Sequence, residues 1–64
     1  MDDRDIWLSA KRLVDLYGED ATIHAAMRAD ELLEQGDLDG AGTWRRVLAA
    51  VKELERTEPS GAVH

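Results

Sequence analysis

A glycine followed directly by an aspartate, Gly36-Asp37, separates two apolar-periodic stretches and constrains this chain more than any other feature. Gly36 suits the position just beyond a helix end, where the backbone turns left-handed and a Cβ would be penalised. Asp37 suits the N-cap of the next helix, because its carboxylate can accept from backbone N–H groups that have no partner in the helix. With so few residues between two helices, an antiparallel hairpin is the accessible geometry. We therefore predict that the chain folds back at this joint.

A first amphipathic helix is predicted before the joint, from a cap at Asp2 or Asp3 to Tyr17. Gly18 suits the position after the helix end, and Asp20 suits the N-cap of the following helix. At about 100° per residue the apolar side chains fall on one stripe. We expect this stripe to face the core: Ile6, Trp7, Ala10, Leu13, Val14 and Tyr17.

Two further helices are predicted, one from Ala21 to Gln35 and one from Leu38 to Arg56. The arc of the second helix that we expect in the core is rich in alanine: Ala25, Ala26, Ala29, Leu32 and Leu33. The third helix presents a continuous stripe: Trp44, Val47, Leu48, Val51 and Leu54. Because alanines leave room for large neighbours, we expect Trp7 and Trp44 to fill the space beside them.

These patterns predict an all-α fold, a small three-helix bundle with a tight antiparallel hairpin between the second and third helices. Orthogonal and bundle-like packing of the helices both remain open. No stretch alternates with the period of a β-strand. Residues 1–57 are expected to form a single domain, followed by a disordered C-terminal tail over residues 58–64.

Size and composition limit the classes of function. A chain of 64 residues has a small core and marginal stability, and it has no cysteine for disulfides or thiolate sites, so oligomerisation is the remaining support. The net charge of −6 disfavours nucleic acid and anionic membranes as partners and favours basic ones. No apolar run long enough for a secretory signal or a membrane span is present. We expect a bacterial, cytoplasmic protein without membrane contact.

Two resemblances support a helical interaction domain. The run from Ala25 to Ala41, with the small residue Ala29 in the helix and Gly36-Asp37 at the turn, resembles a single tetratricopeptide-type helix hairpin. That family stacks several repeats and binds peptides, and this chain has room for one. Residues from Asp5 to about Thr57 are similar to a family of short bacterial proteins of unknown function, which implies a compact helical domain and no catalytic residue. The similarity is carried by the segments Ile6-Trp7, Gly18 to Ala21, Arg28 to Leu33, Gly36 to Leu38, and Trp44.

Few residues of this sequence form a pattern that is typical of catalysis or metal binding. Asp37, Asp39 and Gly40 share the pattern of a calcium loop, but Arg46 occupies the position that a bidentate glutamate would need. His24 lies one turn after Asp20, which makes an Asp–His pair possible without the further ligands of a zinc site or an activated nucleophile. We therefore predict no enzyme activity, no metal and no cofactor.

Two surfaces are candidates for partner binding. Ile23 and Met27, together with Leu8 on the polar side of the first helix, are apolar residues outside the expected core. They are accompanied by acids on one face of the second helix, Asp30, Glu31 and Glu34. On the third helix, Arg45 and Lys52 form a modest basic stripe with Arg56. For each group an ordinary solvated surface is the alternative interpretation.

The function predicted from these features is a non-catalytic protein–protein interaction module that associates with itself as a homodimer or with another protein. The alternative is a small acidic regulatory or inhibitory protein that binds a basic, nucleic-acid-binding partner.

Overall fold

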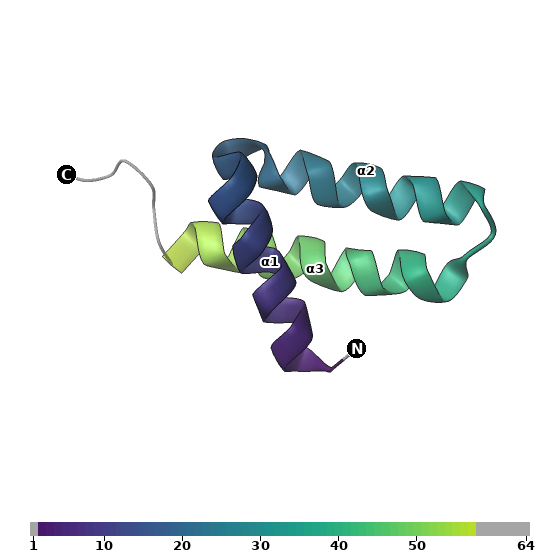
Figure 1. The fold of residues 1–64 in the computed structure, drawn as a ribbon, viewed down its shortest axis with the longest axis horizontal. Coiled ribbons are helices and arrows are strands. Elements are labelled where there is room, and N and C mark those ends of the chain that lie inside the picture. The colour runs from purple at the N-terminus through teal and green to yellow at the C-terminus, as the bar shows by residue number, and fades with distance from the viewer. Residues whose placement is uncertain (1, 58–64) are drawn as a thin grey trace.

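The computed structural model describes residues 2–57, which are helical apart from the ends and one tight turn. The elements are α1 (Asp3–Tyr17), the 3₁₀ turn η1 (Gly18–Asp20), α2 (Ala21–Glu34) and α3 (Leu38–Thr57) (Figure 1). The predicted all-α class is confirmed for these residues. The division into three helices is less distinct, because η1 joins α1 to α2 with no non-helical residue between them. The fold is equally a helical run bent at Gly18 that returns along α3. The predicted tail, residues 58–64, lies outside the described residues.

The joint between α2 and α3 has the predicted chemistry. Gly36 has a φ of 82°, in the left-handed region that favours glycine. The Gly36 N–H donates to the Leu33 carbonyl at 3.0 Å, and the Asp37 N–H donates to the Leu32 carbonyl at 2.8 Å. This pair of bonds is a Schellman motif, which satisfies carbonyls that a helix end leaves without partners. The chain reverses here because the last turn of α2 closes on itself.

Asp37 also begins α3. Its Oδ1 accepts from the Gly40 N–H at 2.9 Å, and its backbone carbonyl accepts from the Ala41 N–H at 3.0 Å. One residue therefore closes the end of α2 through its N–H and caps the start of α3 through its side chain. The side chain leaves no space at Gly40, where an added Cβ would lie 2.8 Å from Asp37 Cγ.

Two glycine substitutions are expected to separate helix propensity from capping. Gly42→Ala meets open space in the first turns of α3 and should raise the free energy of unfolding by about 1 kcal/mol. Gly40→Ala has the same propensity gain, but it displaces the Asp37 cap, whose loss costs about 1 kcal/mol, so little net change is expected. Urea unfolding followed by circular dichroism measures both variants. Equal stabilisation by the two alanines would contradict the tight packing of the cap.

The start of α1 and the bend after it follow the prediction, apart from one hydrogen bond. Asp2 caps α1, since its Oδ1 accepts from the Asp5 N–H at 3.2 Å. Gly18 ends α1 with a φ of 57°, as a residue without Cβ permits. Asp20 occupies the predicted N-cap position of α2, but its side chain makes no capping hydrogen bond. Instead η1 continues directly into α2, with the Ala21 N–H donating to the Gly18 carbonyl.

An aromatic pair that the sequence analysis did not predict spans this bend. The rings of Tyr17 and His24 stack with centroids 3.7 Å apart and an interplanar angle of 17°. Tyr17 is the last residue of α1, and His24 lies in the first turns of α2. Such contacts contribute about 0.5–1.5 kcal/mol beyond area burial, so the stack supports the angle between the two helices.

Helix α3 is the element on which the other two helices pack. Figure 1 shows α2 antiparallel along α3 and α1 crossing the C-terminal half of α3. The Thr22 hydroxyl donates to Glu55 Oε1 at 3.3 Å, which links the start of α2 to the end of α3. Small side chains from all three helices form the central core: Ile6, Ala10, Ala21, Ala25, Val47, Ala50 and Val51.

Three predicted core residues lie elsewhere. The Trp7 and Tyr17 side chains are each 43% exposed, and Leu33 is also exposed, so their assignment to the core is wrong. Trp7 therefore does not fill the space beside the alanines, whereas Trp44 packs against the core in a partly buried position. The space is closed by the approach of the helices themselves, because fully buried Ala10 and Ala25 allow close contact between backbones.

Candidate interaction surfaces

Many of the large apolar side chains of this protein lie on its surface. The largest fully buried side chains are Val47 and Val51, and six of the ten buried residues are alanines. Ile6 and Leu32 are also buried, whereas eight large apolar side chains remain substantially exposed: Trp7, Leu8, Leu16, Tyr17, Ile23, Met27, Leu33 and Leu38. Single exposed apolar residues are ordinary, but eight large ones on a domain of this size are an appreciable exposed apolar surface.

The first predicted surface is present on the side of α2 that faces solvent. We use the name α2 outer face for its five residues, Ile23, Met27, Asp30, Glu31 and Glu34, all of which are exposed. Ile23 and Met27 lie one turn apart and are 56% and 54% exposed. The buried residues of α2, Ala21, Ala25, Ala29 and Leu32, occupy the opposite side of the helix. Helical spacing alone therefore brings together five of the eight predicted partner-binding residues.

The acids on this face differ in whether they have a partner. Glu31 Oε1 accepts from Arg28 Nη1 at 3.1 Å, an exposed pair of the kind that contributes at most about 1 kcal/mol. Asp30 and Glu34 form no hydrogen bond or ion pair with any residue from 2 to 57. Their charges are available to a partner.

Charge is distributed unequally between the antiparallel helices. Residues 19–37 contain six acids and the single base Arg28, a net charge of −5. Residues 38–57 contain four bases and three acids, a net charge of +1. Arg45, Arg46 and Lys52 on α3 are exposed and form no ion pair with another described residue. The molecule thus presents an acidic helix and a weakly basic helix to solvent.

The structure does not join all eight predicted residues into one surface. Arg45 and Lys52 lie on the solvent side of α3, on a different helix from the α2 outer face. Leu8 is exposed on the side of α1 turned away from buried Ala10 and belongs to neither group. The eight residues therefore divide into a compact acidic and apolar face, a separate basic stripe and an isolated leucine.

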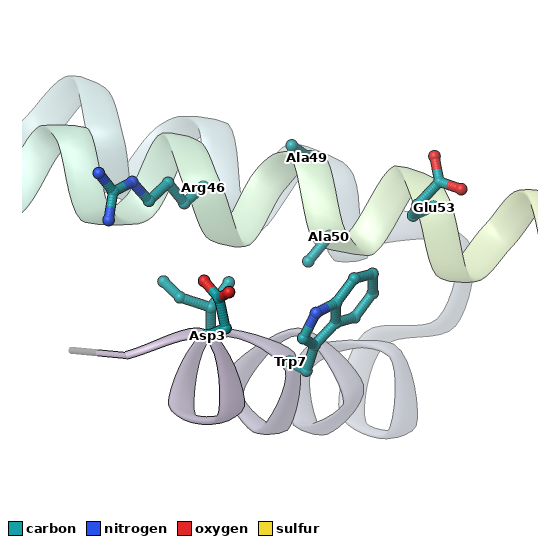
Figure 2. Close-up of a pocket in the computed structure, with 7 residues that line it drawn as sticks. Asp3, Trp7, Arg46, Ala49, Ala50 and Glu53 are labelled. Atoms are coloured by element: carbon teal, nitrogen blue, oxygen red, sulfur yellow. The ribbon is translucent and has the colours of Figure 1, made fainter.

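Sequence reasoning missed a groove between α1 and α3. Its volume is about 310 Å³, at the lower end of the range for ligand pockets. Figure 2 shows Asp3 and Trp7 extending from α1 toward α3, with Ala50 pointing at the indole; Arg46, Ala49 and Glu53 of α3 also line the groove. We use the name α1–α3 groove for the site lined by these six residues and Ile6. Its apolar lining and the half-exposed indole of Trp7 suit an inserted apolar side chain.

A signal for this groove existed in the sequence. Ala49 and Ala50 are small residues on the side of α3 that carries Arg46 and Glu53, and Trp7 lies at the edge of the α1 stripe. The two groups are some forty residues apart in the chain, so only their packing shows that they meet. A second hollow, of about 340 Å³, lies on the other side of Arg46 and is lined also by Leu38, Asp39, Gly42 and Thr43.

Reactive groups are not gathered at either surface. Within residues 2–57, no three His, Asp or Glu side chains lie close enough to hold a metal ion. His24, the histidine in this part of the chain, has its ring stacked on Tyr17. Both surfaces consist of apolar side chains bordered by charges.

Comparisons with known proteins do not assign this chain to a family or a function. None of the helices over residues 2–57 combines the length and apolar character that a membrane span requires. No family model, no curated protein and no solved structure matches this chain.

Proposed function

We propose that this chain is a non-catalytic protein–protein interaction module, a small three-helix bundle that associates with copies of itself. The observation that carries the proposal is the exposure of eight large apolar side chains on a small domain, among them Trp7, Ile23 and Met27, which are about half exposed. Burying apolar surface stabilises by about 25 cal/mol per Å², so association provides burial that the core of the monomer lacks. In this proposal the helical bundle holds binding surfaces in place and does not form an active-site pocket.

A second candidate function is favoured by one further observation, the unequal charge. The acidic segment 19–37, with unpaired Asp30 and Glu34, complements a basic surface. A small acidic protein of this kind would bind the basic surface of a nucleic-acid-binding partner. Its acidic segment would take the place of the phosphates of the nucleic acid.

Light scattering and sedimentation equilibrium from micromolar to millimolar protein test the first function. We expect the mean mass to rise with concentration, and we expect Ile23→Asp/Met27→Asp to suppress the rise without loss of helical circular dichroism, because both side chains are exposed. The mass of a single chain at every concentration would overturn self-association. The second function would then be supported by binding of a basic amphipathic peptide with an affinity that falls steeply with salt.

A further inference from the structure

We propose that the α2 outer face of one copy packs, with its helix parallel, on an exposed basic row of α3 in a second copy. This inference rests on the proposed function, because it names the two surfaces through which the module associates with itself. We use the name α3 basic stripe for four exposed residues of α3: Arg45, Ala49, Lys52 and Arg56.

The two surfaces have the same spacing along their helices. Four residues of the α2 outer face follow one another at intervals of four, three and four: Ile23, Met27, Asp30 and Glu34. The residues of the α3 basic stripe follow one another at the same three intervals. Side chains at these intervals form one row along an α-helix, and two such rows pack against each other when the helices lie nearly parallel. In the parallel register each residue of one row therefore lies opposite one residue of the other.

The first half of this register matches side chains by size. Met27 lies opposite Ala49, so that a long and adaptable side chain meets a small one. Ile23 lies opposite Arg45, whose aliphatic stem can cover an apolar neighbour while the guanidinium remains in water. The contact therefore removes from water the two side chains of α2 that are 56% and 54% exposed in the monomer.

The second half of the register matches opposite charges. Asp30 lies opposite Lys52, and neither side chain has an ion pair among residues 2–57. Glu34, which also has no such partner, lies opposite Arg56. Arg56 is paired with Glu53 of its own helix at 3.3 Å, but exposed pairs of this kind are weak and leave a guanidinium able to bind a second carboxylate. The unpaired acids of one surface thus meet bases of the other.

The acids of α3 lie beside the α3 basic stripe and not within it. Glu53 and Glu55 are each about 80° from the stripe around the helix, on opposite sides of it. Glu53 is paired with Arg56, and Glu55 accepts a hydrogen bond from Thr22 of its own α2 at 3.3 Å. Asp39 lines the second hollow, on another side of α3. The incoming acids therefore face the basic row of α3.

The other surfaces of the chain suit the α2 outer face less well. Parallel pairing of two α2 outer faces would bring Asp30 and Glu34 beside the same acids of the other copy, and like charges reject such an arrangement. The α1–α3 groove is lined by Asp3 and Glu53 against the single base Arg46, so it opposes an acidic face in the same way. The α3 basic stripe avoids both oppositions.

Charge-exchanged variants test this contact. Asp30→Lys/Glu34→Lys makes the α2 outer face basic, and Arg45→Glu/Lys52→Glu makes the α3 basic stripe acidic, at positions that are all exposed. Each variant alone has two surfaces of like charge, so we expect its self-association to weaken about tenfold or more. An equimolar mixture should form complexes of both chains, because the unchanged acidic face of one variant meets the unchanged basic stripe of the other. Sedimentation equilibrium measures the mean mass in each case.

Net charge does not explain the expected complexes. Each of the four substitutions changes the charge by two, so the variants carry −2 and −10 where the parent chain carries −6, and both remain acidic. Asp5→Lys/Asp15→Lys is the matched control, because it replaces two exposed acids of α1 outside both surfaces. It should associate like the parent chain. Circular dichroism verifies that every variant is folded, and glutamine replaces glutamate at positions 45 and 52 if α3 is disturbed.

A second exchange tests the parallel register. Asp30→Lys alone should weaken association, and Asp30→Lys/Lys52→Asp should recover most of the loss, because the two new side chains lie opposite each other. Asp30→Lys/Arg45→Asp should show no recovery, since Arg45 would lie opposite Asp30 only if the helices were antiparallel. Recovery in this last variant alone would overturn the parallel arrangement.

The outcomes separate this inference from the proposed function. Charge-exchanged variants that each associate like the parent chain, or that form no complexes when mixed, would overturn the contact between α2 and α3 and leave the interaction module in place. A parent chain that is monomeric at every concentration would overturn both. Complexes in the mixture that neither variant forms alone, with recovery in Asp30→Lys/Lys52→Asp, would support this contact.

Discussion

Ala25→Leu is expected to remove most of the stability of this protein. Ala25 is fully buried on α2 within a core of small side chains, and a leucine there must push α2 away from the helices that it contacts. Overpacking of this kind costs about 1–3 kcal/mol, and we expect the upper value because the site has no exposed fraction. A core of this size supplies only about 3–5 kcal/mol in total. Urea unfolding followed by circular dichroism should show a transition at much lower urea or none.

Ala26→Leu provides the matched control for this prediction. Ala26 is the neighbouring residue on α2 and is partly exposed, so the added side chain can turn toward solvent. We expect a loss of under about 1 kcal/mol, which is typical of changes outside the closely packed core. Similar losses in the two variants would show that the buried alanines do not set the distance between the helices.

The two tryptophans are expected to differ strongly in their importance for stability. Trp44 packs against the core in a partly buried position on α3, and we expect Trp44→Ala to cost about 3 kcal/mol, the lower value for buried tryptophan. Trp7 is 43% exposed at the α1–α3 groove, and Trp7→Ala should cost about 1 kcal/mol or less. Chemical unfolding followed by circular dichroism measures both values.

The fluorescence of the single-tryptophan proteins checks the same assignment. The Trp7→Ala protein retains only Trp44, whose emission should be blue-shifted relative to that of Trp7 in the Trp44→Ala protein, provided that the latter is folded. The assembly of the parent chain, proposed above, would add stability at high concentration, so both measurements belong at low micromolar protein. Equal stabilities of the two variants would contradict the packing of Trp44 against the core.

Local sequence was sufficient for the ends of the helices and for the direction of the chain. The Schellman motif at Gly36 and the caps at Asp2 and Asp37 involve residues within a few positions of each other, so their chemistry does not depend on distant packing. Asp20 has the predicted N-cap position without the capping hydrogen bond, because the same residue types serve a cap or a 3₁₀ turn, and the choice depends on the angle between α1 and α2.

Helical periodicity was also sufficient to group the residues of the α2 outer face. It did not distinguish the centre of an apolar stripe from its edge, because that distinction depends on where a neighbouring helix crosses. Trp7 and Leu33 lie at such edges and are exposed, whereas Ala50, which was not assigned to the core, is buried where α1 crosses α3.

The amino-acid sequence by itself determined the helices, the reversal at Gly36-Asp37 and the acidic character of α2, since each follows from interactions between near neighbours in the chain. Only the tertiary structure decided that alanines would make up most of the buried core and that Trp7 would border a groove with Arg46 and Ala49. Those features arise from the contact of α1 with α3, and such contacts between distant segments depend on how the whole surfaces of the helices fit together.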